Sequence, residues 1–151
     1  MRILPWAFGA AGMLLLGLAI GLGIWAGMPA NPLTALRLIV GYSGALSKLC
    51  YPLLAGLAIW TLVLVALRLA GRPLKDLSLL TILSLVPPAI GLVVLLLTGL
   101  IILRVAAQTH TTDLIVIAPG LAEAITPFAF GLIIGAVAAT LKAAPTGRTV
   151  A

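Results

Sequence analysis

Four long apolar stretches constrain this chain more than any other feature of its sequence. They cover about residues 5–27, 51–69, 77–103 and 114–141. A helix rises 1.5 Å per residue and needs about 20 mostly apolar residues to cross a bilayer, so each stretch is long enough to span it. The sequence therefore predicts an all-α integral membrane protein: a single domain over residues 1–151 with four transmembrane helices and no extramembrane domain.

Composition excludes the soluble alternatives. Only 8% of the residues are charged and 63% are hydrophobic, whereas a soluble domain has about a quarter charged residues. Such hydrophobicity also excludes a disordered chain. The nine Lys and Arg residues are spread along the sequence and form no basic patch, so nucleic acid is not an expected partner. The expected surroundings are the lipid bilayer.

The distribution of basic residues predicts the orientation. Lys and Arg gather on the cytoplasmic side of short loops. With four spans, six basic residues fall on one side and three on the other, which predicts that both termini are cytoplasmic. The six are Arg2, Arg68, Arg72, Lys75, Lys142 and Arg148, and the three are Arg37, Lys48 and Arg104.

Several glycines are candidates for close helix packing. Gly17 and Gly21 are four residues apart, so they share a helix face on which another backbone can approach closely. An oligomer contact and the ordinary glycine content of membrane helices both fit this pair. Gly120, Gly131 and Gly135 in the fourth stretch are further candidates for helix packing or an oligomer contact.

The connection over residues 29–48 permits two interpretations. Apolar residues at helical spacing between Leu33 and Tyr42 fit a short helix lying in the membrane interface, and the prolines and glycines fit a loop equally well.

After this connection, Cys50 is expected to be a packing residue. Trp60, too central in its stretch to anchor it at an interface, is expected in the core.

Prolines interrupt the third and fourth stretches. Pro87 and Pro88 remove backbone donors and clash one turn back, which predicts a kink or local unwinding near residues 84–88. Pro127 weakens the fourth helix in the same way. Thr98, further along the third stretch, is expected to bond back to its own helix.

Glu123 is the one acidic residue deep in an apolar stretch. It lies roughly 13 Å along the fourth helix from Leu114, near the middle of a bilayer. A carboxyl group there costs on the order of 3 kcal/mol on insertion scales and marks a candidate functional site. Thr126, three residues on, can hydrogen-bond to it. A proton-exchanging group and a neutral structural Glu bonded across a helix interface both fit.

The fourth stretch resembles a known family. The run from Ala118 to Ile125, with Ala129, Gly131 and Leu132 after it, is similar to the APG-[IL]-AEA-[IL] helix of the ExbB/TolQ/MotA proton-channel subunits, most closely ExbB. The loop before it fits as well, and Pro88-x-x-Gly91-Leu92 in the third stretch fits the start of the family's pore helix. The resemblance covers about residues 88–141, which would form the pore half.

This resemblance implies a function. It implies a homo-oligomer, usually a pentamer, around a single-span partner of the ExbD/TolR/MotB type in a bacterial inner membrane, with proton motive force driving mechanical work. Glu123 matches the family's pore-helix glutamate, and Thr126 and Thr98 are the neighbouring candidates for a proton pathway. Neither an enzyme activity nor a cofactor is expected, because the sequence offers no nucleophile, base pair or metal-ligand cluster.

Two departures from the family pattern leave a second function open. The positions of the family's two pore threonines fall on Leu95 and Phe128, both apolar. Thr98 and Thr126 lie within one helical turn of them. The alternative is therefore a non-conducting scaffold subunit that keeps the oligomeric shell. A small secondary transporter fits less well, because the two halves show no internal repeat.

Overall fold

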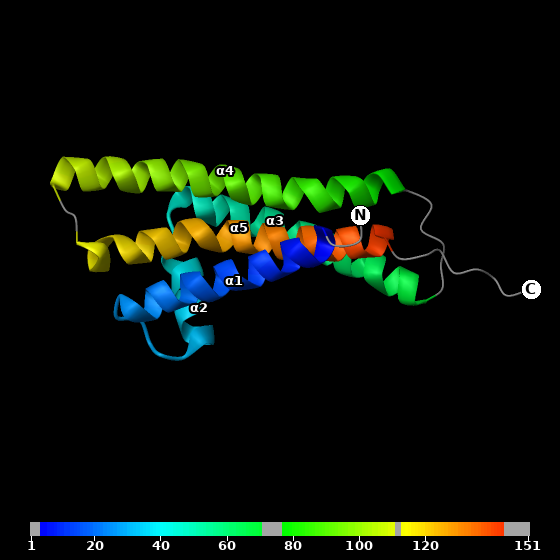
Figure 1. The fold of residues 1–151 in the computed structure, drawn as a ribbon, viewed down its shortest axis with the longest axis horizontal. Helices are drawn as coiled ribbons and strands as arrows, with labels where there is room; N and C mark the ends of the chain where they lie inside the picture. The colour runs from blue at the N-terminus through cyan, green and yellow to red at the C-terminus, as the bar shows by residue number, and fades with distance from the viewer. Residues whose placement is uncertain (1–3, 71–76, 111–112, 144–151) are drawn as a thin grey trace, which may run out of the picture.

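The described residues form a bundle of helices. The computed structural model describes residues 4–70, 77–110 and 113–143, and within these ranges every regular element is a helix. The helices are α1 (Leu4–Trp25), α2 (Pro32–Tyr42), α3 (Ala45–Leu69), α4 (Leu77–Thr109) and α5 (Leu114–Ala143). The four long ones run lengthwise along the molecule, and the short α2 lies beside α1 (Figure 1).

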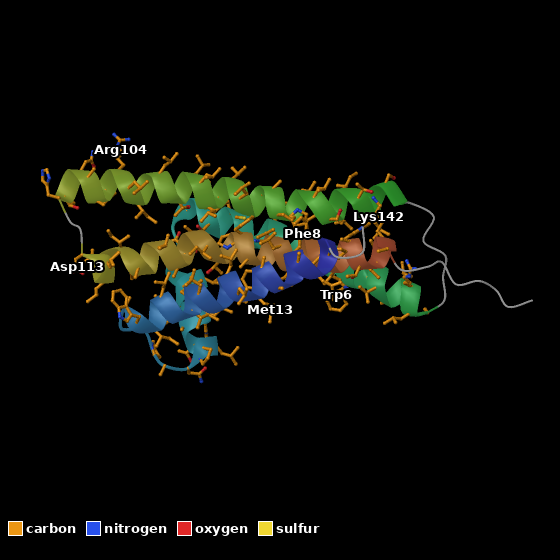
Figure 2. The ribbon with its side chains drawn as sticks, in the orientation of Figure 1. Trp6, Phe8, Met13, Arg104, Asp113 and Lys142 are labelled. Atoms are coloured by element: carbon orange, nitrogen blue, oxygen red, sulfur yellow. The ribbon has the colours of Figure 1, made fainter. Side chains whose placement is uncertain are left out.

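The four long helices confirm the predicted fold class. Each is long and apolar enough to cross a membrane, with candidate spans of 21, 25, 32 and 30 residues. Their outer faces are apolar: Trp6 and Met13 of α1 are 76% and 63% exposed and point away from the bundle (Figure 2). The chain thus has the architecture of a multi-pass membrane protein.

Two helices are longer than predicted. α3 begins at Ala45 rather than at about residue 51, with Lys48 exposed in its first turns and Pro52 inside it. α4 continues to Thr109 past Arg104, whose side chain points outward (Figure 2). A charge on the outer face does not end a helix, because the side chain extends into polar surroundings.

The connection over residues 29–48 contains a helix, as one of the two interpretations predicted. At the end of α1, Gly27 adopts a φ of +95°, and Met28 N–H donates to Gly23 O at 3.0 Å, which closes the helix and reverses the chain. Asn31 then caps α2 by accepting a hydrogen bond from Leu33 N at 3.0 Å. Ile39 of α2 is buried against the bundle.

α5 is the central helix. It contacts each of the other four helices. Of its most apolar 18-residue segment, 56% is buried, against 17–22% for the corresponding segments of the other three spans. The buried face is made of small residues, which lets neighbouring backbones approach closely.

Trp60 of α3 is 54% exposed, so the prediction of a core position was wrong: it lies on the outward face of its helix.

Glycines bring α4 and α5 into backbone contact. A Cβ added at Gly91 of α4 would lie 2.5 Å from Phe128 Cα, and one added at Gly131 of α5 would collide with Pro87 O. A Cβ added at Gly135 of α5 would lie 2.7 Å from Ser84 O of α4. These contacts place Gly131 and Gly135 in helix packing within the chain.

The other glycine candidates differ from this pair. A Cβ added at Gly120 would meet the Ile102 side chain at 3.2 Å, a contact with a flexible group. Added at Gly17 or Gly21, it would have no atom within 4 Å. The chain therefore packs α1 through other residues, and the stripe formed by Gly17 and Gly21 faces outward.

The prolines do not interrupt their helices. α4 continues through Pro87 and Pro88, and α5 continues through Pro127 (Figure 1), so the local unwinding predicted as one outcome does not occur. Pro87 and Pro127 are fully buried at the α4–α5 contact. The close neighbouring helix holds the backbone there, as happens for prolines in membrane helices.

Basic side chains hold the ends of three helices together. Arg68 Nη1 of α3 donates to Leu141 O of α5 at 2.5 Å, which satisfies a carbonyl in the last turn of α5. Lys142 Nζ donates to Thr81 Oγ1 of α4 at 2.8 Å. Four basic residues used to predict the orientation, Arg2, Arg72, Lys75 and Arg148, lie outside the described residues.

Candidate functional site

Glu123 lies against the first turn of α3. Its Oε1 accepts a hydrogen bond from Gly44 N at 2.7 Å and another from Ser47 Oγ at 2.9 Å. Gly44 is the N-cap residue of α3 and has no side chain to cap the helix itself. The carboxyl group of α5 therefore supplies the cap of a helix that precedes it by more than seventy residues.

This arrangement has a clear physical basis. In a capping box, a carboxyl at the third helical position accepts a hydrogen bond from the N-cap N–H. Here Ser47 occupies that third position, and Glu123 reaches in from another helix to bond both groups. The N-terminus of a helix carries partial positive charge, so it favours a carboxylate. Glu123 is thus hydrogen-bonded across a helix interface, a geometry that fits both interpretations of this residue.

The contact also fixes the level of Glu123 along the bundle. The residue is about a third of the way along the 30 residues of α5, yet it lies level with the start of α3. Glu123 thus lies nearer the start of α5 than its end. α4 and α5 extend past this level at the end of the bundle where they are joined (Figure 1).

Thr126 hydrogen-bonds within its own helix rather than to the carboxyl group, the contact that its spacing also allowed. Its Oγ1 donates to Ala122 O at 2.7 Å, one turn back in α5, and the residue is 0% exposed. A helical threonine has this carbonyl within reach of its hydroxyl without any rearrangement, so the local bond wins. Thr126 is packed inside the bundle of a single chain.

The α4 residues predicted near the pathway lie on a packed surface. Thr98 is buried at 9% exposure. Leu95 packs against an apolar cluster that includes Ala122 and Ile125, the neighbours of Glu123 on α5. The hydrogen bonds of Glu123 go to α3, and neither Thr98 nor Thr126 takes part in them.

Sequence reasoning missed the α3 part of this site. With the second span started at Tyr51, Ser47 fell in a connecting loop. The spacing of Gly44, Ser47 and Tyr51 is the signal that was available, since residues three and four apart share a helix face. Ser47 is 0% exposed. Cys50 is buried in a cluster with Leu54, as its predicted packing role requires.

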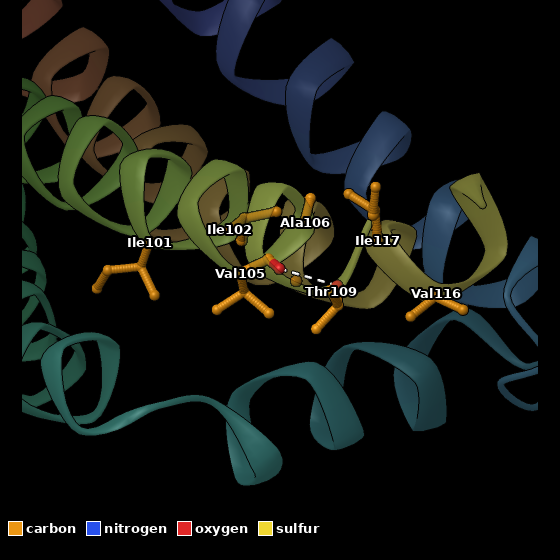
Figure 3. A pocket seen from close by; sticks show the side chains of 8 residues that line it. Ile101, Ile102, Val105, Ala106, Thr109, Val116 and Ile117 are labelled. Carbon is orange, nitrogen blue, oxygen red and sulfur yellow. Dashed lines mark hydrogen bonds between the residues drawn. The ribbon is translucent and has the colours of Figure 1, made fainter. Parts of the chain in front are cut away.

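A second feature of this end of the bundle is an apolar groove. It lies between α4 and α5, beyond Gly120, and has a volume of about 190 Å³ (Figure 3). Its polar member, Thr109, donates to Val105 O at 2.8 Å. Its lining is Ile101, Ile102, Val105, Ala106, Thr109, Val116, Ile117 and Gly120. Within the part of the chain that the structure describes, no three His, Cys, Asp or Glu side chains are placed to hold a metal ion.

Comparison with known proteins adds no relative. No protein-family model, curated protein or solved structure matches this chain. The fold and the site define a class: a multi-pass helical membrane protein in which one carboxyl group is held at the junction of two apolar helices. The geometry of that group and the sequence pattern around it are the basis for a function.

Proposed function

We propose that this chain is a membrane subunit of the ExbB/TolQ/MotA kind. Copies of it form a homo-oligomer, a pentamer by resemblance, around a single-span partner of the ExbD/TolR/MotB type in a bacterial inner membrane. Both termini are cytoplasmic, and proton motive force drives the complex. Glu123 is the group that exchanges protons.

One observation carries this proposal. Glu123 is a half-buried ionisable side chain on an apolar helix long enough to span a membrane, held by two hydrogen bonds at the point where α3 begins. Ionisable groups inside membrane segments are expensive and mark ion or proton pathways. The motif around it supports the same class, since the run from Ala118 to Ile125 resembles the family's pore helix.

A second candidate function is supported by the surroundings of Glu123. The hydroxyl of Thr126 is committed to Ala122 O, and Leu95 packs against the apolar cluster beside the carboxyl group. A dry, packed lining does not pass protons. In this alternative the chain is a non-conducting scaffold, and Glu123 serves only to fix the start of α3.

Proton flux separates the two functions. The complex, purified with its partner, is reconstituted in vesicles that contain a pH-sensitive dye, and a potassium gradient drives protons across. Glu123→Gln keeps an oxygen that accepts from Gly44 and Ser47 but removes the exchangeable proton. Asp113→Asn is the matched control, because it makes the same change of carboxyl to amide at the N-cap of α5, where Asn also caps well.

The proton-driven function requires flux in the unchanged protein, its loss in Glu123→Gln and its retention in Asp113→Asn. Equal flux in all three proteins excludes a role for Glu123. No flux in the unchanged complex, together with an image of a ring whose centre is filled by a packed partner, favours the scaffold.

A further inference from the structure

Tyr51 carries a buried hydroxyl group that none of the described residues satisfies. Its phenol oxygen is enclosed and has no hydrogen-bond partner among the described residues. A buried donor left unpaired is expensive, and native structures contain few of them. Such a group therefore calls for an explanation in terms of its surroundings.

Those surroundings are the Glu123 site. Tyr51 follows Ser47 by four residues on α3, so the two side chains lie on the same face, one turn apart. Ser47 itself donates to Glu123 Oε1, and Tyr51 is within electrostatic range of Glu123. The face of α3 that meets Glu123 thus presents a backbone N–H, an aliphatic hydroxyl and a phenol in order along one stripe.

Glu123 has the capacity for a third donor. Both of its hydrogen bonds in the described structure end on Oε1. A carboxylate has about four lone-pair sites on its two oxygens, so Oε2 is able to accept as well. The neighbouring hydroxyl of Ser43 is committed elsewhere, since it donates to Val40 O at 2.8 Å. Lys48 is exposed on α3.

We propose that Tyr51 is the third member of the Glu123 site and donates its phenol proton to Glu123 Oε2, directly or through one bound water. The polar groups around the carboxyl then all come from α3, at the positions of Gly44, Ser47 and Tyr51. They take the place of the hydroxyls that are missing at Leu95 of α4 and Phe128 of α5. The hydrogen bond is inferred from the unpartnered Tyr51 hydroxyl beside this site, and its use in proton movement rests on the proposed function.

The sequence makes a direct test possible because Glu123 is the only glutamate in the chain. Cell-free synthesis with glutamate carrying ¹³C at its side-chain carboxyl labels this one residue. Infrared difference spectra, labelled minus unlabelled, then report the carboxyl stretching band of Glu123 in the intact complex. That band responds to the number and strength of the hydrogen bonds the group accepts.

Three variants of α3 are compared with the unchanged protein. Tyr51→Phe removes the proposed donor, and Ser47→Ala removes an observed one. Thr61→Val is the matched control, because the hydroxyl of Thr61 is buried on the same helix but donates to Leu57 O at 2.8 Å. We expect the band to shift in Tyr51→Phe and in Ser47→Ala and to stay in place in Thr61→Val.

A shift in Ser47→Ala with none in Tyr51→Phe overturns the proposal. If Tyr51→Phe does not fold, 3-fluorotyrosine is incorporated into a Tyr42→Phe background, where Tyr51 is the only tyrosine. Its more acidic phenol strengthens a real hydrogen bond and shifts the band, and an unchanged band again overturns the proposal. A band shift in Tyr51→Phe in a complex that passes no protons keeps the hydrogen bond and excludes the proton-driven function.

Discussion

At the scale of single residues, Glu123 shows how one side chain in an apolar protein can fix local structure. It bonds the backbone of Gly44 and the hydroxyl of Ser47 through the same oxygen. A hydrogen bond contributes about 0.5–1.5 kcal/mol net, and a buried donor left without its acceptor costs about 1–3 kcal/mol. The carboxyl group therefore stabilises the start of α3, where Gly44 has no side chain to cap the helix.

Substitution of Glu123 should show this structural role. We expect Glu123→Ala to lower the free energy of unfolding by about 2–3 kcal/mol, since two donors at the start of α3 lose their acceptor. Glu123→Gln should lose only about 1 kcal/mol, because the amide oxygen still accepts both hydrogen bonds. Unfolding by denaturing detergent, followed by circular dichroism, measures the difference. Equal losses in the two variants would contradict the cap.

At the scale of helices, the contact between α4 and α5 depends on glycine. Gly91, Gly131 and Gly135 let the two backbones meet without intervening side chains. Without a hydrophobic effect between helices in lipid, such close packing is a main source of association. The contact also covers the prolines of both helices, so elements weakened by Pro87 and Pro127 remain continuous.

A pair of identical substitutions tests this contact. Gly131→Ala places a methyl group against Pro87 O, which cannot move without moving the backbone of α4. We expect a net loss of about 1–3 kcal/mol of stability, as for other overpacked sites. Gly17→Ala has open space and should be neutral or slightly stabilising, because alanine favours the helix. Thermal unfolding in detergent measures both variants.

Two outcomes refine the interpretation of this pair. Gly131→Ala as stable as the unchanged protein would show that the α4–α5 contact is looser than described. A change in oligomer size in Gly17→Ala, at unchanged monomer stability, would support the predicted oligomer contact of Gly17 and Gly21. Light scattering of the detergent-solubilised protein detects it.

At the scale of the whole molecule, α5 is surrounded by the other helices, and α1, α3 and α4 turn apolar faces outward. The joined ends of α4 and α5 lie at one end of the bundle, and the end of α3 and the start of α4 lie at the other (Figure 1). Four spans return the chain to the side on which it began. Glu123 and the start of α3 lie toward the end where α4 and α5 are joined.

Thiol labelling in intact cells tests this topology. In a Cys50→Ala background, a cysteine replaces either Gln108, near the end of α4, or Ala70, just after α3, both exposed positions. With the orientation of the proposed function, we expect a membrane-impermeant maleimide added outside the membrane to label position 108 and to leave position 70 unlabelled until the membrane is opened. Labelling at both positions without opening the membrane would exclude the four-span arrangement.

The class of fold follows from the sequence alone, because the length and hydropathy of a membrane helix are local properties. The four spans can be predicted from it, and so can the position of Glu123 among apolar residues. What Glu123 touches depends on how the helices pack. Its partners, Gly44 and Ser47, precede it by more than seventy residues on another helix, and no periodicity specifies how two helices face each other. The same reason explains why Trp60 was misplaced: spacing along one helix places residues on a face, but packing between helices decides which face is inside.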